Sequence, residues 1–492
     1  MTDLLGNDLN LRYVLLSPEI AIAITAALVL FADAFRRELN LGGFALPALS
    51  VVGLVVALIL TLGLSLVWVD GSDDFARLVT VDDFTSFFRV LFIGVTLVVI
   101  IGSHEYISRH VSHIGEFYSL LLFSTVGAML MAGARDLLTA YLAVEVMSFS
   151  LYILVSLTKN DSRSGEASLK YVLLGGVASA MLLYGLSFIY GVGGSTQYSE
   201  IAAALSQSTA DVELPLLLGL ALVIAGLGFK ASAVPFHMWT PDAYEGAPIP
   251  ITAYLSATSK AATFALLLRW FAGPLLPAID DWQWMVAAIS VLTMVVGNLV
   301  ALQQTNIKRL LAYSSIGQVG FMLMAITAIS DTTGSALLLH LSGYLITNLA
   351  LFMAIVAFYN RTGSEEIVSF RGLAQTNPYL ALVMTVGLFS LAGMPLLAGF
   401  LTKFILFQSV VSEGFTWLVV IALVVSTVSL YYYLQVIRHM YLYQPEGDAS
   451  RWRLTPTGYL ATGVLLIGVL WVGVYATPFY TIADRAIAPL FA

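Results

Sequence analysis

Long apolar runs separated by short polar breaks cover almost the whole chain. A membrane-spanning helix needs about 20 consecutive, mostly apolar residues, and runs of this length are helices because lipid offers the backbone no hydrogen bonds. About fourteen runs qualify: 13–34, 44–68, 84–103, 115–133, 137–158, 166–190, 214–239, 249–272, 283–303, 307–328, 333–359, 378–410, 415–441 and 456–480. The pattern predicts an all-α polytopic membrane protein with about 14 transmembrane helices.

Two of these runs are interrupted near their middle. The seventh contains Pro235, and the twelfth contains Pro395 between glycines. Proline removes a helix hydrogen bond and clashes one turn back, so we expect two broken helices. Each break lies within about two helical turns of a lysine, Lys230 in the first case and Lys403 in the second. Matched breaks five spans apart indicate an inverted repeat, although proline is also generally common in membrane helices.

The matched breaks suggest a division of the chain into four parts. Residues 1–114 would hold helices 1–3, residues 115–274 a first repeat of helices 4–8, residues 275–443 a second repeat of helices 9–13, and residues 444–492 helix 14. An odd number of helices in each unit gives the two five-helix repeats opposite topologies.

Composition excludes several classes of protein. The chain is 59% hydrophobic and 11% charged, whereas soluble domains carry roughly 25% charged residues. The net charge of −8 argues against nucleic acid as a partner. The absence of cysteine excludes disulfides, cysteine-ligated zinc and thiol-ligated iron–sulfur clusters within this chain.

The distribution of basic residues predicts an orientation. Lysines and arginines are about twice as frequent in the connections that follow odd-numbered spans, which places those connections in the cytoplasm and both termini outside it. We therefore expect a multi-pass protein of a bacterial cell (plasma) membrane. The residues counted on the cytoplasmic side are Arg36, Arg37, Arg109, Lys159, Arg163, Lys308, Arg309, Arg361, Arg371, Arg451 and Arg453.

Charged side chains also occur inside the apolar runs, where each costs several kcal/mol. Glu145 lies nine residues after Asp136, about 13 Å into its predicted helix. A carboxylate at that depth requires a cationic partner, and Lys230 is the best candidate. Moving the carboxylate away would let desolvation expel the lysine's proton. The alternative is a static buried ion pair that fixes packing.

Three further lysines extend the chain of charges. Lys260, about ten residues from either end of its span, suits a central proton relay, or it is a lysine wetted by a structural cavity. Lys403, after the second break, is expected to be the exit station. Lys170 lies about one turn into its span and could serve the relay or snorkel to the cytoplasmic face.

Two histidines lie at intermediate positions, His237 beside the first break and His340 in the eleventh span. Unperturbed histidine titrates near neutral pH, so either could pass protons between lysines, or it could be a hydrogen-bonded packing residue. The sequence shows no phosphate loop, dinucleotide-binding pattern or cluster of metal ligands.

Three segments carry a family resemblance: GFKASAVPFHMWTPDAYEGAPIPITAYLSATSKAATFALLLR, NIKRLLAYSSIGQVGFML and AGMPLLAGFLTKFILF. They resemble the antiporter-like membrane subunits of respiratory complex I, the proton-translocating NADH–quinone oxidoreductase, and their cation/proton antiporter relatives. Lys403 stands where subunit M of that complex typically has a glutamate, and the chain ends without the long lateral helix of subunit L. These features favour the subunit N branch.

The resemblance implies a role in a translocase. It implies that Glu145, Lys230, Lys260 and Lys403 translocate protons, with Lys170 and His340 as accessories. It further implies that quinone reduction elsewhere drives the path, that subunits K and M are neighbours, and that flavin, iron–sulfur clusters and quinone belong to partner subunits, leaving no cofactor in this chain. The alternative is a subunit of a multi-subunit Na⁺/H⁺ antiporter.

Overall fold

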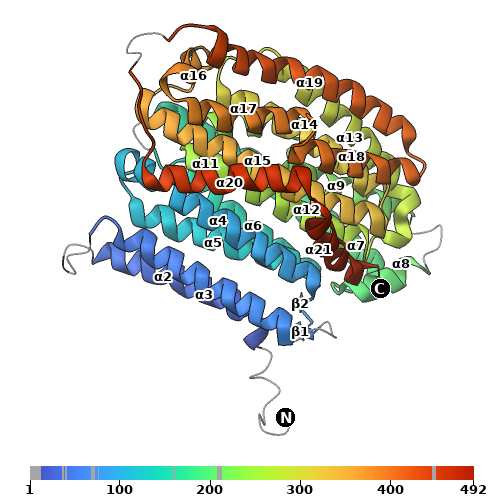
Figure 1. Ribbon diagram of the computed structural model, residues 1–492. Helices are drawn as coiled ribbons and strands as arrows, with labels where there is room; N and C mark the ends of the chain where they lie inside the picture. The colour runs from blue at the N-terminus through green and yellow to red at the C-terminus, as the bar shows by residue number, and fades with distance from the viewer. Residues whose placement is uncertain are drawn as a thin grey trace.

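The computed structural model describes residues 13–35, 38, 42–67, 73–75, 77–158, 161–207, 213–445 and 450–491. The chain is almost entirely helical in these ranges, and its long helices lie roughly side by side (Figure 1). The α-helices are α2 (Ser17–Ala34), α3 (Ala45–Val67), α4 (Asp83–His110), α5 (Ile114–Gly133), α6 (Leu137–Val155), α7 (Ser162–Gly193), α8 (Tyr198–Leu205), α9 (Glu213–Ala231), α10 (Trp239–Gly246), α11 (Ile249–Tyr254), α12 (Lys260–Phe271), α13 (Ile279–Ala301), α14 (Ile307–Thr327), α15 (Asp331–Thr362), α16 (Leu373–Thr376), α17 (Pro378–Ala392), α18 (Ala398–Ser412), α19 (Thr416–Leu442), α20 (Pro456–Val474) and α21 (Thr477–Ile487). A π-helix, η3 (Leu255–Ser259), joins α11 to α12, and the 3₁₀ helices are η4 (Leu276–Ala278), η5 (Ile367–Phe370) and η6 (Ala488–Leu490).

The prediction of an all-α polytopic membrane protein is confirmed. Thirteen helical segments in the described part are long and apolar enough to cross a membrane. The remaining predicted span, the twelfth, is divided between the shorter helices α17 and α18. The last predicted span extends too far, because α20 ends at Val474 and a separate amphipathic helix, α21, begins at Thr477 with a proline in its first turn.

Both predicted helix breaks are present. In the first, α9 ends at Ala231, and Ser232 follows with a left-handed φ of 71°. The indole of Trp239, at the start of α10, donates a hydrogen bond of 2.9 Å to the carbonyl of Phe229. A side chain from beyond the break thus adds a second hydrogen bond to a carbonyl near the end of α9, which also accepts from the amide of Ser232 at 3.0 Å.

The second break lies between α17 and α18. Gly393 ends α17 with a φ of 86°, which glycine tolerates because it has no Cβ. Two residues before α18, Leu396 also has a left-handed φ, of 70°. At the start of α18, Gly399 packs so closely on α17 that a Cβ would lie 1.8 Å from the Ser390 carbonyl oxygen. The amide of Gly399 accordingly donates to the Ser390 hydroxyl at 3.0 Å.

The only sheet in the described part is a two-stranded antiparallel hairpin of β1 (Asp73–Phe75) and β2 (Val79–Val81). It leads into α4, whose first turn is capped by Asp82. Asp82 also forms a two-oxygen ion pair with Arg269 at the end of α12, with distances of 3.0 Å. This pair anchors one end of the central helix α12 to α4.

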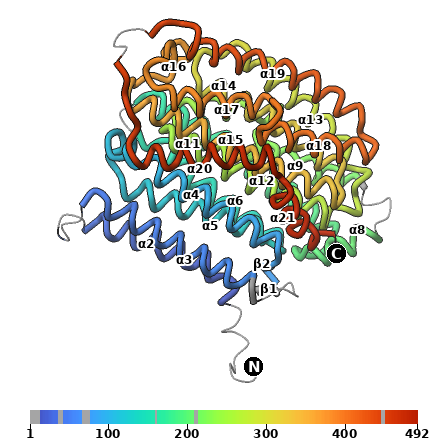
Figure 2. The backbone as a smooth tube through the Cα atoms, viewed as in Figure 1, coloured from blue at the N-terminus to red at the C-terminus, as the bar shows by residue number. Residues whose placement is uncertain are grey.

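The helices differ strongly in burial. We compared how much of the apolar stretch of each membrane-spanning helix is buried. The buried share is 100% for α12 with the turns that precede it, 94% for α14 and 83% for α15. It is only 33% for α2 and 28% for α20. Figure 2 shows α15 and α12 in the middle of the molecule, with α2 and α3 along one edge and α19 along another. The interior helices are therefore the ones that carry Lys260 and His340.

Some sequence predictions are not tested by the fold. The division at residues 115–274 and 275–443 stays a prediction, with one broken helix in each range. Arg36, Arg37 and Lys159, which contributed to the predicted orientation, lie outside the described residues.

Candidate functional site

Lys230 lies in the last turn of α9, directly before the first break. Its ammonium donates hydrogen bonds to the hydroxyls of Ser148, at 2.7 Å, and Tyr152, at 3.3 Å, both on α6. The side chain is buried, and the Nζ atom lies 5.7 Å from the centre of the Tyr152 ring. Hydroxyls and an aromatic face solvate the ammonium, which forms no direct ion pair with a carboxylate in the described part of the chain.

Glu145 lies on the same face of α6, because positions 145, 148 and 152 have helical spacing. Its carboxylate accepts a hydrogen bond of 2.6 Å from Ser179 on α7. No direct ion pair joins Glu145 to Lys230, both of which are described, although Glu145 is near enough to interact with the ammonium electrostatically. The predicted partnership of the two residues stays a prediction. Each of the two charges contacts hydroxyl groups, Ser179 in the case of Glu145 and Ser148 and Tyr152 in the case of Lys230.

The surroundings of Glu145 are only partly protein. Glu145 is half-buried, and its helix neighbours Leu142 and Phe149 are 55% and 58% exposed. In the isolated chain, this carboxylate therefore lies at the edge of an apolar outer surface. A charge is costly against lipid, so this edge suits contact with another subunit.

Lys260 is the first residue of α12, directly after the π-helix η3. It is 1% exposed, and its ammonium donates to the hydroxyl of Ser232, in the first break, at 3.2 Å. Its Nζ atom lies 5.7 Å from the centre of the Tyr244 ring. Because single π-turns inside α-helices are frequent at functional sites, the position of η3 supports a functional role for Lys260.

Hydrogen bonds connect the helix of Lys260 to α15. Ser256, one turn before Lys260, accepts a hydrogen bond from the amide of Asn348 and, through its carbonyl, one of 3.5 Å from Tyr344. Tyr344 also shares a hydrogen bond of 2.7 Å with Ser315 on α14. This buried polar cluster lies between the predicted central station and the second repeat.

Lys403 lies on α18 after the second break, in a buried position. Its ammonium donates a hydrogen bond of 2.6 Å to the carbonyl of Leu391, in the last turn of α17. The C-terminal end of a helix carries partial negative charge, so the broken helix itself stabilises the cation. Lys403 and the second break are therefore in direct contact, and the predicted role of this lysine as the exit station stays a prediction.

His340 lies next to this lysine site. Its Nδ1 atom is 3.0 Å from the hydroxyl of Thr402, the residue before Lys403. Its Nε2 atom is buried and has no hydrogen-bond partner among the described residues. The structure thus brings His340 and Lys403 together, as a relay through either ring nitrogen requires.

Lys170 belongs to a different environment. Its side chain is 45% exposed and forms ion pairs of 2.8 Å with Glu166 and Asp242. Asp242 also pairs with Arg309 at 3.0 Å. Burial alone would raise the pKa of Asp242, but the hydrogen bonds from Lys170 and Arg309 outweigh it and hold that pKa below its usual value of 3.8. Lys170 is therefore part of a charged network at the end of its helix.

His237 lies in the first break, where it is half-buried between the exposed residues Pro235 and Met238. Its Nδ1 atom has no hydrogen-bond partner among the described residues. The structure does not place it next to any of the buried lysines through a described contact. Its predicted accessory role stays a prediction.

The buried lysines share one property. Lys230, Lys260 and Lys403 are 3%, 1% and 5% exposed, and none of them forms an ion pair with a carboxylate in the described part of the chain. Their ammonium groups contact only hydroxyl oxygens, a carbonyl oxygen and aromatic rings. Lys308, the other buried lysine among the described residues, is paired with Glu365 at 2.7 Å.

Several residues of the site were not singled out by the sequence. Ser179, Tyr152 and Ser232 are hydroxyl residues of the kind that occurs throughout membrane helices, and no local pattern distinguishes them. Their importance depends on which faces of α6, α7 and α9 meet. The described residues also include no group of three or more histidine, aspartate or glutamate side chains placed to hold a metal ion; the prediction that this chain holds no cofactor stays untested.

Comparison with known proteins gives consistent likenesses. The family model described as NADH:quinone oxidoreductase/Mrp antiporter, TM, matches residues 134–429. NADH-quinone oxidoreductase subunit N of Moorella thermoacetica is 42% identical over 411 residues, which cover 84% of this chain and 86% of that protein.

Two solved structures show the same architecture. A chain of respiratory complex I from Thermus thermophilus with bound aureothin is similar with a TM-score of 0.78 and 31% identity, covering 95% of this chain and 99% of that one. A chain of the Mrp complex from Dietzia sp. DQ12-45-1b has a TM-score of 0.84 and 22% identity, covering 96% of this chain and 97% of that one. The second likeness concerns the fold alone.

Proposed function

The chain belongs to the NADH:quinone oxidoreductase/Mrp antiporter family of membrane subunits, and we propose that it is a proton-translocating membrane-arm subunit of an NADH–quinone oxidoreductase. The identity of 42% to a subunit N over most of both chains supports the subunit N position within that complex. The other subunits of the complex are then its partners, with K and M as its neighbours. NADH oxidation and quinone reduction take place in those partners, and this chain holds no redox centre.

The observation that carries the proposal is the set of three buried lysines without a carboxylate partner. Buried charge without a counter-charge is strongly unfavourable in a membrane. A chain that retains three such groups in hydrogen-bonded surroundings gains something other than stability from them. A side chain that binds and releases a proton is the use that fits lysine best.

The proposed path begins at the Glu145 side. Loss of negative charge at Glu145, or its movement toward a neighbouring subunit, reduces the electrostatic stabilisation of the protonated Lys230. Hydroxyl groups contact both charges, Ser179 at Glu145 and Tyr152 at Lys230, without neutralising the lysine. Lys230 then releases its proton toward Lys260 through the region of Ser232, to which Lys260 is already hydrogen-bonded.

The second half of the path uses α15. The polar cluster of Ser256, Asn348 and Tyr344 leads from the helix of Lys260 to α15. His340 lies about one turn from Tyr344 on α15 and contacts Thr402, beside Lys403. Lys403 releases the proton on the non-cytoplasmic side, where we also place both termini, with the multi-pass chain in a bacterial cell membrane.

The test uses the assembled complex in sealed vesicles. E145Q and K230M should each reduce proton translocation and the quinone reduction coupled to it, with the amount of assembled complex nearly unchanged. E116Q is a matched control, because Glu116 is a half-buried glutamate whose described partner is His113 at the start of α5. Full coupled activity in both E145Q and K230M would contradict the proposal.

Purification separates the proposal from the antiporter alternative, which has a likeness of fold in its favour at 22% identity. Isolation of the chain together with flavin and iron–sulfur subunits is the expected result. An assembly that lacks redox centres and exchanges sodium for protons would favour the antiporter instead.

A further inference from the structure

A chain of buried hydroxyl groups branches from the polar cluster beside Lys260 and crosses to α19. Tyr344 on α15, which belongs to that cluster, shares a hydrogen bond of 2.7 Å with Ser315 on α14. The preceding residue, Ser314, is hydrogen-bonded to Tyr433 on α19. The hydroxyls of Tyr344 and Tyr433 are near enough to each other to interact electrostatically. Polar groups therefore continue from α15 past α14 to α19.

The branch then passes from α19 to α13. Tyr432 packs against Tyr433, with ring centres 4.4 Å apart, and donates a hydrogen bond of 3.0 Å to the Oδ1 atom of Asn298. Asn298 and Tyr432 are both 2% exposed. Asn298 lies three residues before the last residue of α13, about 4.5 Å from the end of that helix. The branch thus extends from the surroundings of Lys260 to within about one helical turn of the end of α13.

We propose that this branch is the route by which cytoplasmic protons enter the relay at Lys260, an inference that rests on the proposed function. For each proton that Lys403 releases, one must enter from the cytoplasm, and the distribution of basic residues assigns the end of α13 to that side. A hydroxyl both accepts and donates a hydrogen bond. Each hydroxyl can therefore take a proton from one neighbour and give its own to the next, until an unprotonated Lys260 receives one and the hydroxyls are left as they were.

Tyr244 on α10 lies between the branch and Lys260. The Nζ atom of Lys260 is 5.7 Å from the centre of the Tyr244 ring. The Tyr244 hydroxyl is buried and has no hydrogen-bond partner among the described residues, although Tyr344 and Ser315 are near enough to interact with it. Buried polar groups of this kind are typically satisfied by an ordered water molecule. A water molecule beside Tyr244 would complete the connection from Tyr344 to Lys260.

The branch suits transfer of protons because its hydroxyls have uncharged surroundings. The side chains that interact electrostatically with the hydroxyls of Tyr344, Tyr432 and Tyr433 are those of other tyrosines, serines and one glutamine. A carboxylate or an imidazole on the branch would bind a proton and hold it, since these groups titrate at or below neutral pH. Tyrosine and serine hydroxyls stay neutral and pass the proton on.

Gly317 on α14 fixes the outer end of the branch. A Cβ at this position would lie 2.6 Å from the Nδ2 atom of Asn298, so the amide lies between α13 and α14 only because residue 317 has no side chain. The same Nδ2 atom donates a hydrogen bond of 2.8 Å to the carbonyl of Met294. This bond leaves Oδ1 as the atom that faces Tyr432.

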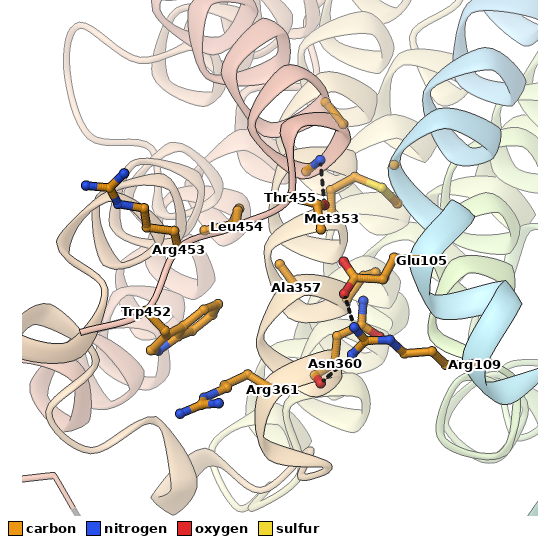
Figure 3. A pocket seen from close by; sticks show the side chains of 14 residues that line it. Glu105, Arg109, Met353, Ala357, Asn360, Arg361, Trp452, Arg453, Leu454 and Thr455 are labelled. Carbon is orange, nitrogen blue, oxygen red and sulfur yellow. Dashed lines mark hydrogen bonds and ion pairs between the residues drawn. The ribbon is translucent and has the colours of Figure 1, made fainter. Parts of the chain in front are cut away.

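A cavity elsewhere at the cytoplasmic end of the bundle offers protons no comparable route. It has a volume of about 260 Å³ and lies between the last turns of α4 and α15 and the first turn of α20 (Figure 3). Arg109 at this cavity is paired with Glu105 at 2.7 Å, and arginine does not release a proton in proteins. The buried walls formed by Met353 and Val356 are apolar. The hydrogen-bonded branch is therefore the better entry.

The test measures proton translocation by the intact complex in sealed inside-out vesicles, whose outer medium contacts the cytoplasmic side. S314A and Y432F each remove one hydroxyl of the branch, and we expect each to lower the rate by about tenfold at equal amounts of assembled complex. Y379F is the matched control and should leave the rate unchanged. The Tyr379 hydroxyl also joins two helices, through a hydrogen bond of 3.0 Å with Thr462, but lies outside the branch.

The pH of the outer medium separates an entry route from a structural contact. When entry is damaged, the supply of protons limits turnover, so the rates of S314A and Y432F should fall further as the outer pH rises and should not respond to the pH inside the vesicles. A deficit that is the same at every outer pH would overturn the entry route, because the hydrogen bonds would then only hold the helices together. An equal loss in Y379F would overturn it for the same reason.

K260M, measured in parallel, separates this inference from the proposed function. Normal rates in S314A and Y432F beside a slow K260M would overturn the entry route and leave the lysine relay intact. A normal rate in K260M would contradict the relay itself, and the entry route with it.

Discussion

Replacing Lys260 by methionine separates a proton-carrying lysine from a structural one. Removal of the buried charge relieves a cost of about 2.5–3.5 kcal/mol on the membrane-insertion scale. It also removes one charged hydrogen bond to Ser232, worth about 1.5–3 kcal/mol, and a cation–π contact with Tyr244 worth about 0.5–2 kcal/mol. Methionine fills most of the same volume. The stability of the chain should therefore change by about 2 kcal/mol or less, while proton translocation falls by at least about tenfold.

Lys308 provides the matched control. It is as buried as Lys260, but it pairs with Glu365 at 2.7 Å and donates to the carbonyl of Ala247 at 2.9 Å. Removing one partner of a largely buried pair costs about 3 kcal/mol or more. K308M should therefore destabilise the complex more than K260M does, yet the complex that remains assembled should translocate protons at the normal rate.

The assay measures thermal unfolding of the purified complex and acidification of sealed vesicles after addition of NADH, both normalised to the amount of assembled complex. Normal acidification by K260M would refute the reasoning. So would a K260M complex that loses activity only in proportion to its loss of stability, because that result is expected of a lysine that merely supports packing.

Three further outcomes are expected. Y152F removes the hydroxyl that accepts a hydrogen bond from Lys230 and should slow proton translocation by about tenfold, the effect of about 1.4 kcal/mol on a barrier. Y171F, which changes the neighbouring ring, should not slow it. Equal rates in the two variants would exclude a role for the Tyr152 hydroxyl. G399A would place a Cβ 1.8 Å from the Ser390 carbonyl oxygen on α17 and should cost about 1–3 kcal/mol or more of stability, which lowers the melting temperature of the complex. An unchanged melting temperature would show that the break can widen. The carboxylate of Asp242 has a lowered pKa in the folded chain, so its contribution to stability is present above its unfolded pKa near 3.8 and is lost as the pH falls through the lower folded value. D242N should abolish this dependence of stability on acid pH, which unfolding at a series of pH values would measure.

The sequence predicted the helices and the breaks well, because the information is local. The length of an apolar run locates a span, and a proline interrupts the helix at its own position, as Pro235 and Pro395 do. The depth of Lys260 within its span follows from counting residues at 1.5 Å each. These predictions needed no knowledge of which helices are neighbours.

The contacts between helices could not be predicted in the same way. Lys230 was expected to be the cationic partner of Glu145 because both lie deep in the membrane, but depth does not determine which face of α6 meets α9. In the structure, Glu145 contacts the hydroxyl of Ser179 and Lys230 that of Tyr152, and the two charges form no ion pair. Similarly, Lys170 is part of an ion pair with Asp242, which lies on the short helix α10 beyond the first break. The length of apolar runs does not reveal that helix.

The most direct test of the proton path is the rate of proton translocation by sealed vesicles that contain the complex with K403M, compared with wild type at equal amounts of assembled complex. We predict a rate at least about tenfold lower, because the last buried lysine of the path is then missing. An unchanged rate, with the same number of protons moved per NADH oxidised, would contradict the proposal that the buried lysines of this chain carry protons.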